Sequence, residues 1–170
     1  MQKLQCLLNA LVILIISGVL LSAYCVEFFW HETPCPLCML QRVAMIGAAI
    51  GFCFNLFFGV KMAHYGFSLL ASIVGGAVAL RQISLHVCPG TVPFGFPVLG
   101  LSLYTWSFIV FVCVILSIAG LSFLYDPLRE EANTYTPKKM VKLTWALLLI
   151  VTASNAITTF IHCGFGPCAD

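Results

Sequence analysis

The stretch HETPCPLCMLQRVAMIGAAIGFCFNLFFGV, residues 31–60, joins a short polar segment to a long apolar run. The polar part carries Cys35 and Cys38 in the pattern C-x-x-C, and Arg42 follows four residues after Cys38. The apolar part, residues 43–60, approaches the roughly 20 helical residues that cross a hydrocarbon core about 30 Å thick. The stretch therefore predicts a membrane helix with a chemically reactive group near its start.

The composition of the whole chain is that of a membrane protein. Of its 170 residues, 61% are hydrophobic and only 8% are charged, whereas a soluble domain has roughly 25% charged residues. The formal net charge of +2 gives no indication of a nucleic-acid partner. Runs long enough to span a bilayer cover approximately residues 7–26, 43–60, 66–85, 104–124 and 143–161. We predict an all-α integral membrane protein that forms one domain over residues 1–170.

The first apolar run has two interpretations. Lys3 precedes it and the small residues Ser22 and Ala23 lie near its end, as in a cleaved signal peptide. The run is longer than a typical signal core, however, and Tyr24 is too bulky for a small-residue cleavage site. We therefore expect a retained helix.

Small residues within the spans predict close contacts between helices. Gly47 and Gly51 form a G-x-x-x-G pair, and Gly75 and Gly76 are adjacent. Glycines let helix backbones approach each other closely in a membrane, so we assign these four to packing.

The basic residues predict the orientation, because short cytoplasmic loops carry an excess of Lys and Arg. With the N-terminus in the cytoplasm, six of the eight basic residues lie inside and only Arg42 and Arg81 lie outside. The predicted outer segments are residues 27–42, 86–103 and the tail 162–170, and the cytoplasmic connection is residues 125–142. This topology places on the outer face Cys35, Cys38, Cys88, Cys163 and Cys168, with Cys25 close to it.

The C-x-x-C spacing is shared by dithiol oxidoreductases and zinc sites. Disulfides persist in the periplasm or outside the cell, so cysteines gathered at the outer face indicate redox use. Unpaired N–H groups and the helix dipole favour a thiolate at a helix start, and we place it at Cys38. Arg42 lies about one turn later, where it either reaches lipid headgroups or supplies positive charge beside the thiolate and an electron-accepting ligand.

The residues CPLCMLQR (35–42), which open the second membrane helix, resemble the signature of the disulfide bond formation protein B (DsbB) family of quinone-dependent membrane oxidoreductases. The segment VLGLSLYTWSFIVF (98–111) also resembles the way in which that family enters its fourth helix. The resemblance covers roughly residues 5–125. It implies a DsbB-like four-helix bundle, to which this chain adds a fifth transmembrane helix.

The resemblance also implies a function in the bacterial inner membrane. The protein would reoxidise a periplasmic DsbA-like oxidase of the thioredoxin fold and pass the electrons to ubiquinone or menaquinone. Cys35 and Cys38 would be the quinone-coupled pair, with Cys38 facing the quinone and Arg42 as the cation beside it.

The outer end of the third helix offers further candidate quinone contacts, because ionisable groups inside a membrane indicate a functional site. These candidates are Arg81, Gln82 and His86. Interfacial anchoring is the alternative for Arg81, and solvation is the alternative for His86.

The chain departs from the family in its second cysteine pair, which normally lies in the loop between the third and fourth helices. Here that loop holds only Cys88, and the chain ends with Cys163-Gly-Phe-Gly-Pro-Cys168 after its fifth helix. We expect the second redox pair to be Cys163 with Cys168, and Cys88 to be a relay or a partner of Cys25. A bridge from Cys88 to either tail cysteine remains the other possibility.

Simpler interpretations accompany these. A structural disulfide in the tail, or zinc held by four outer cysteines, would also use the cysteines, but no suitably spaced histidine pair supports a metal. Cys6, Cys53 and Cys113 are expected to be inert packing residues, and Glu27 and Glu32 to be solvated. The alternative functions are a vitamin K epoxide reductase-like quinone reductase and a non-catalytic membrane protein with structural disulfides.

Overall fold

The computed structural model describes residues 2–30, 35–86, 98–125 and 138–164. Within them lie five α-helices: α1 (Gln2–Trp30), α2 (Pro36–Phe58), α3 (Met62–His86), α4 (Leu103–Phe123) and α5 (Lys138–Cys163). Each helix is long and apolar enough to cross a membrane. The prediction of an all-α membrane protein with five spans is therefore confirmed.

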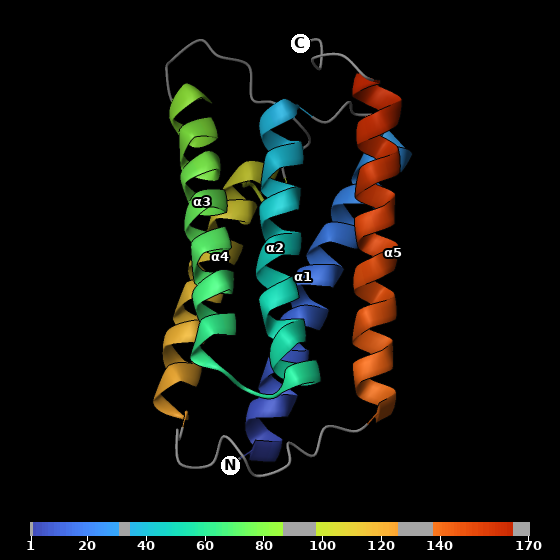
Figure 1. Cartoon of the computed structure of the whole chain (residues 1–170). Coiled ribbons are helices and arrows are strands. Elements are labelled where there is room, and N and C mark those ends of the chain that lie inside the picture. Colours follow the sequence, from blue (N-terminus) through green and yellow to red (C-terminus); the bar gives the residue numbers. More distant parts are fainter. Residues whose placement is uncertain (1, 31–34, 87–97, 126–137, 165–170) are drawn as a thin grey trace.

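The helices stand side by side and alternate in direction (Figure 1). The central helix, α2, packs against all four others and most extensively against α3. At the periphery of the bundle, α4 packs mainly on α3, and α5 packs on α2 and α1. One end of the bundle thus gathers the last turns of α1, α3 and α5 and the first turns of α2 and α4. We call it the thiol end, because it holds Cys35 and Cys38.

The helices extend beyond the apolar runs. Most of the loop predicted at residues 27–42 is helical, because α1 continues to Trp30 and α2 begins at Pro36, so that boundary was wrong. The predicted connection 125–142 is likewise too long at its end, because α5 begins at Lys138. Hydropathy detects only the part of a helix that matches the hydrocarbon core. The start of α2 is instead set by Pro36, whose fixed φ and missing N–H suit the first helical turn.

The described part of the predicted outer loop 86–103 contains a tight turn before α4. Val98 and Leu101 exchange backbone hydrogen bonds of 2.9 and 3.1 Å. The residues between them, Leu99 and Gly100, have φ values of 53° and 78°. Trp106 Nε1 donates to the Val98 carbonyl over 2.9 Å and so ties the turn to α4. Residues 98–101 are therefore not helical, and α4 begins after them at Leu103.

A buried polar cluster joins α1, α2 and α3 at the end opposite the thiols. Asn9 Nδ2 donates to the Gln5 carbonyl over 2.7 Å and to the Tyr65 hydroxyl over 2.9 Å. Asn55 Nδ2 donates to Asn9 Oδ1 over 3.3 Å, and Asn55 Oδ1 lies 3.0 Å from His64 Nδ1. Since lipid offers these groups no partner, the hydrogen bonds favour one mutual register of the three helices.

Glycine allows α2 and α3 to approach each other closely. A Cβ atom added at Gly51 would lie 2.6 Å from the His64 carbonyl oxygen and would also meet the Ser68 side chain. One added at Gly75 would lie 2.7 Å from Ala44 Cβ. The predicted packing role of these two glycines is confirmed.

We expect Gly51→Ala to lower the thermal midpoint of the detergent-solubilised protein, because overpacking a close contact costs about 1–3 kcal/mol. Gly18→Ala is the matched control, since a Cβ at Gly18 meets no atom within 4 Å. Differential scanning fluorimetry of the two variants measures the difference. Equal midpoints would contradict the close approach of α2 to the His64 carbonyl.

Candidate active site

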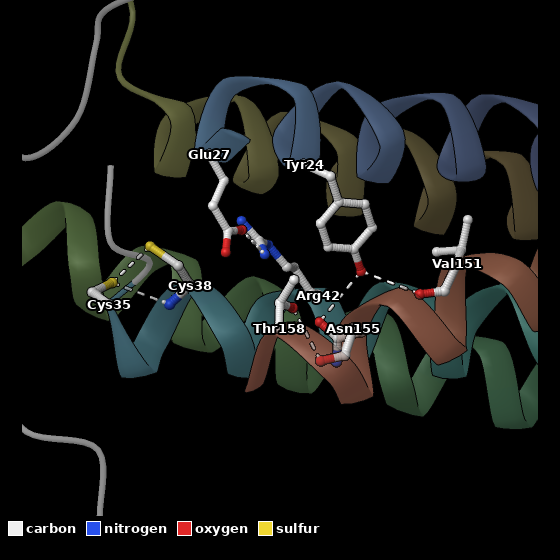
Figure 2. Close-up of polar contacts among 8 residues, drawn as sticks. All are labelled: Tyr24, Glu27, Cys35, Cys38, Arg42, Val151, Asn155 and Thr158. Carbon is white, nitrogen blue, oxygen red and sulfur yellow. Dashed lines mark hydrogen bonds and ion pairs between the residues drawn. The ribbon is translucent and has the colours of Figure 1, made fainter. Parts of the chain in front are cut away.

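The C-x-x-C motif forms the first turn of α2 (Figure 2). Cys35 is the N-cap residue, with φ −71° and ψ 157°, and Pro36 follows as the first helical residue. The Cys38 backbone N–H donates to Cys35 Sγ over 3.2 Å. A sulfur thus takes the place of the side-chain oxygen that usually caps a helix. The motif supplies both the reactive group and the start of the helix that carries it.

The two sulfur atoms face each other. Cys35 Sγ and Cys38 Sγ lie 2.6 Å apart, and both side chains are half-buried. Closing them into a disulfide therefore needs little movement. A dithiol that closes in this way releases two electrons and two protons.

The amide of Gln82, on α3, lies against both sulfurs. Its Nε2 atom is 3.2 Å from Cys35 Sγ and 3.3 Å from Cys38 Sγ. Gln41 Nε2 donates to Gln82 Oε1 over 2.6 Å, which holds the Gln82 amide group in this orientation. Both glutamines are at most 2% exposed. The structure thus places Gln82 beside the thiols, while its predicted contact with a quinone stays a prediction.

The hydrogen bonds of this turn favour a thiolate on Cys35. The hydrogen bond with the Cys38 side chain lowers the pKa of Cys35 below that of an ordinary thiol, although partial burial opposes this shift. The Cys38 backbone N–H and the Gln82 amide act in the same direction as the thiol. The sequence placed the helix-stabilised thiolate on Cys38. In the reduced pair the lowered pKa belongs to Cys35 instead, because Cys35 occupies the cap position and its sulfur accepts the Cys38 backbone N–H.

The lowered pKa predicts a pH profile for Cys35. Because the thiolate form reacts, alkylation of the reduced protein by iodoacetamide should reach half its maximal rate well below the pKa of about 8.5 of a free cysteine. Gln82→Leu removes an N–H donor and should move the profile to higher pH. Ser84→Ala, on an exposed part of α3, is the control and should leave it in place. A Cys35 that titrates like a free thiol, measured by peptide mass spectrometry, would refute the assignment.

Arg42 is buried one turn beyond the thiols. Its Nη1 atom donates to Glu27 Oε2, on α1, over 2.7 Å. Its guanidinium carbon lies 4.9 Å from the centre of the Tyr24 ring, as in a cation–π contact. Figure 2 shows Glu27 and Tyr24 reaching Arg42 from the same helix. Arg42 is only 9% exposed, so its charge is held inside the protein rather than among lipid headgroups.

The prediction that Glu27 is solvated was wrong. Glu27 is 9% exposed and is the ion-pair partner of Arg42. Removing either partner of such a buried ion pair typically costs about 3–5 kcal/mol, because the charge that is left has no compensation. Glu32 lies outside the described residues.

The remaining candidates on α3 are Arg81 and His86. Arg81 is exposed on the helix surface, which agrees with interfacial anchoring. His86 is half-buried, donates from Nδ1 to the Gln82 carbonyl over 2.9 Å, and stacks on Tyr104 with 5.2 Å between ring centres. The predicted contact of Arg81 and His86 with a quinone stays a prediction.

The other cysteines fall into two groups. Cys6 and Cys53 are at most 2% exposed, as predicted for packing residues, whereas Cys113 is exposed on α4 and that prediction was wrong. Cys25 is an exposed free thiol on α1. The predicted second pair lies outside what the structure describes, namely Cys88, Cys168 and the side chain of Cys163. Its pairing therefore stays a prediction.

In the described part of the chain, no group of three or more His, Cys, Asp or Glu side chains is placed to hold a metal ion. The site's described polar atoms instead belong to amides, a guanidinium, a carboxylate and two thiols. Of these groups, the thiol pair is the one that can be oxidised, with release of two electrons and two protons.

Sequence reasoning missed three residues of this site, which are Tyr24, Glu27 and Gln41. Each is polar, lies in a membrane helix and is at most 9% exposed. Burial of polar groups in a membrane is costly unless they are paired. Polarity within a span was thus the available signal, but the partners come from other helices and could not be read from one segment.

The fold and the site define a class, a helical membrane protein with a C-x-x-C thiol pair at a helix start and a buried arginine beside it. The family model for disulfide bond formation protein DsbB matches residues 5–94, which is more than half of the chain. The chain belongs to the DsbB family. The match includes α1, α2 and α3 with the thiol pair, and excludes α4 and α5.

Curated relatives agree with this assignment. Disulfide bond formation protein B of Chromohalobacter salexigens is 36% identical over 89 residues, covering 49% of this chain and 50% of the relative. The protein of the same name from Cupriavidus necator is 35% identical over 83 residues, covering 46% and 50%. The chain spans about half the length of the curated relatives it matches. No solved structure matches it significantly.

Proposed function

We propose that the protein is a membrane thiol oxidase that reoxidises a DsbA-like dithiol protein of the thioredoxin fold and passes the electrons to ubiquinone or menaquinone. The observation that carries the proposal is the buried Arg42, one helical turn beyond a pair of thiols whose sulfurs lie 2.6 Å apart. Membership of the DsbB family supports the same reaction, because its relatives are named for disulfide bond formation.

The residues around Arg42 fit a quinone, which is an apolar ring bearing two carbonyl oxygens. A guanidinium has five N–H donors, and the ion pair with Glu27 uses one of them at 2.7 Å. The face of the Tyr24 ring lies against the same guanidinium. When bound, the quinone accepts two electrons and two protons. Arg42 would donate a hydrogen bond to a carbonyl oxygen and stabilise negative charge that develops there.

The thiol pair accounts for the transfer between partner and quinone. Reduced outer cysteines, either Cys163 with Cys168 or a pair that includes Cys88, attack the Cys35–Cys38 disulfide at Cys35. This exchange releases Cys38 as a thiolate on the side of Arg42, which offsets its charge. Completion of the exchange oxidises the outer pair and leaves Cys35 and Cys38 reduced. Their two electrons and two protons then leave together as the disulfide closes again.

A quinone acceptor is also reasonable on energetic grounds. An oxidase such as DsbA has a potential of about −120 mV, against about −270 mV for thioredoxin. Regenerating so strong an oxidant needs an acceptor that is stronger still, and the quinone pool is available to a site within the membrane.

The proposed location is the bacterial inner membrane, with the N-terminus in the cytoplasm and the thiol end at the periplasm. Six of the eight basic residues fall on the cytoplasmic side in this orientation, as the positive-inside bias requires. The periplasm is also the compartment in which disulfides persist.

Quinone depletion distinguishes this enzyme from a membrane protein with structural disulfides. Membranes that carry the protein and a reduced DsbA-like donor should hold Cys35 and Cys38 as free thiols when quinone is extracted. Adding decylubiquinone should reoxidise them, as measured by differential alkylation and peptide mass spectrometry. A pair that stays oxidised with or without quinone would identify a structural bridge and contradict the proposal.

A further inference from the structure

The fifth helix carries a buried polar stripe that faces α1. Asn155 and Thr158 are 6% and 5% exposed, and Val151 is fully buried. Positions 151, 155 and 158 lie on one face of a helix, since residues three and four apart are neighbours. Thr158 Oγ1 donates to the Asn155 carbonyl over 3.1 Å, so this hydroxyl is satisfied within α5. The Asn155 side-chain oxygen instead has its partner outside α5, on α1.

Tyr24 connects this stripe to Arg42. The Tyr24 hydroxyl lies 3.2 Å from the Val151 carbonyl and 3.4 Å from Asn155 Oδ1, both on α5. The other part of the same side chain, its ring face, lies against the Arg42 guanidinium. Figure 2 shows this order, with α5 at the tyrosine hydroxyl and Arg42 between Tyr24 and the cysteines.

We propose that α5 is part of the quinone site, with Asn155 and Tyr24 acting as positioning residues for Arg42. This inference rests on the proposed function for what Arg42 does, but the geometry it describes is independent of it. Glu27 holds one guanidinium nitrogen, and the Tyr24 ring limits how the plane of the guanidinium can turn. The ring itself is 5% exposed and is fixed at its hydroxyl by α5. Loss of the α5 contacts would let the Tyr24 ring and the Arg42 guanidinium move, without removing the charge of Arg42 or of Glu27.

Tyr24→Phe and Asn155→Ala test the proposal, because the first keeps the ring and the second keeps the whole of α1. Each should weaken equilibrium binding of decylubiquinone to the full-length protein about three- to tenfold, the effect of losing one hydrogen bond. The quinone KM should rise by the same factor while kcat stays within about twofold. The double variant should be no weaker than Tyr24→Phe alone, since loss of the Tyr24 hydroxyl already removes its contacts with both Val151 and Asn155. Thr144→Val is the matched control, because it removes a buried hydroxyl of α5 that bonds only within that helix.

A second measurement does not depend on quinone. Phenylglyoxal modification of Arg42, followed by peptide mass spectrometry, should be faster in Tyr24→Phe and Asn155→Ala than in wild type and Thr144→Val. An unchanged modification rate in both variants would overturn the positioning role whatever the ligand is. Faster modification with unchanged quinone affinity would overturn the assignment of α5 to the quinone site. Wild-type protein that neither binds nor reduces quinone would instead overturn the proposed function, and the modification rates would still decide the positioning.

Discussion

Cys38→Ser is expected to reduce quinone reduction, driven by a reduced DsbA-like donor, to the rate measured without the protein. The reason is covalent, because serine cannot form the disulfide with Cys35 that releases the two electrons. The first turn of α2 should also be kept, because residue 38 bonds the capping Cys35 sulfur through its backbone N–H, which serine retains. The fold should therefore survive, and a thermal midpoint near that of wild type would show this.

Cys53→Ser is the matched control for this experiment. Cys53 lies on the same helix and is fully buried, but it belongs to the apolar core rather than to the thiol end. Its substitution should lower stability and leave the turnover of the folded fraction unchanged. Wild-type turnover in Cys38→Ser would remove the C-x-x-C pair from the electron path.

Arg42→Ala is the second change with a large expected effect. It removes a charged hydrogen-bond donor, an interaction typically worth about 1.5–3 kcal/mol, so the quinone KM should rise about 10- to 100-fold. It also leaves Glu27 buried without its ion-pair partner at a typical cost of about 3–5 kcal/mol. Steady-state quinone reduction and thermal unfolding in detergent measure the two effects separately.

The double variant Glu27→Gln/Arg42→Ala separates stability from binding. Neutral glutamine no longer requires a cation, so much of the lost stability should return, whereas the raised quinone KM should remain. Recovery of both would mean that Arg42 only stabilises the fold. An unchanged KM in the single variant would remove Arg42 from the quinone site.

The membrane fold was predictable because hydropathy depends on composition along one segment. All five spans agree with the apolar runs, and the errors lie at helix ends. At the start of α2, for example, Cys35 and Pro36 set the boundary through capping rather than hydropathy. Local patterns thus found the helices, but the local chemistry of the cap decided where one of them began.

The candidate site was only partly predictable. Cys35, Cys38 and Arg42 follow one another at spacings of three and four residues at the start of one helix, so their proximity follows from spacing alone. The contacts of Gln82 with the sulfurs and of Glu27 with Arg42 join residues on different helices. A charge such as that of Glu27 looks solvated in the sequence, because nothing in its own segment shows the partner that makes its burial tolerable.

An anaerobic single-turnover reaction tests the central claim most directly. Fully reduced protein in quinone-free nanodiscs is mixed with excess decylubiquinone, and quinol is quantified while Cys35 and Cys38 are mapped by alkylation and mass spectrometry. The account predicts that quinol forms in step with a Cys35–Cys38 disulfide, one quinone per pair, and that Cys38→Ser forms no quinol. Quinol formation while both cysteines stay reduced, or a disulfide that forms without quinol, would contradict it.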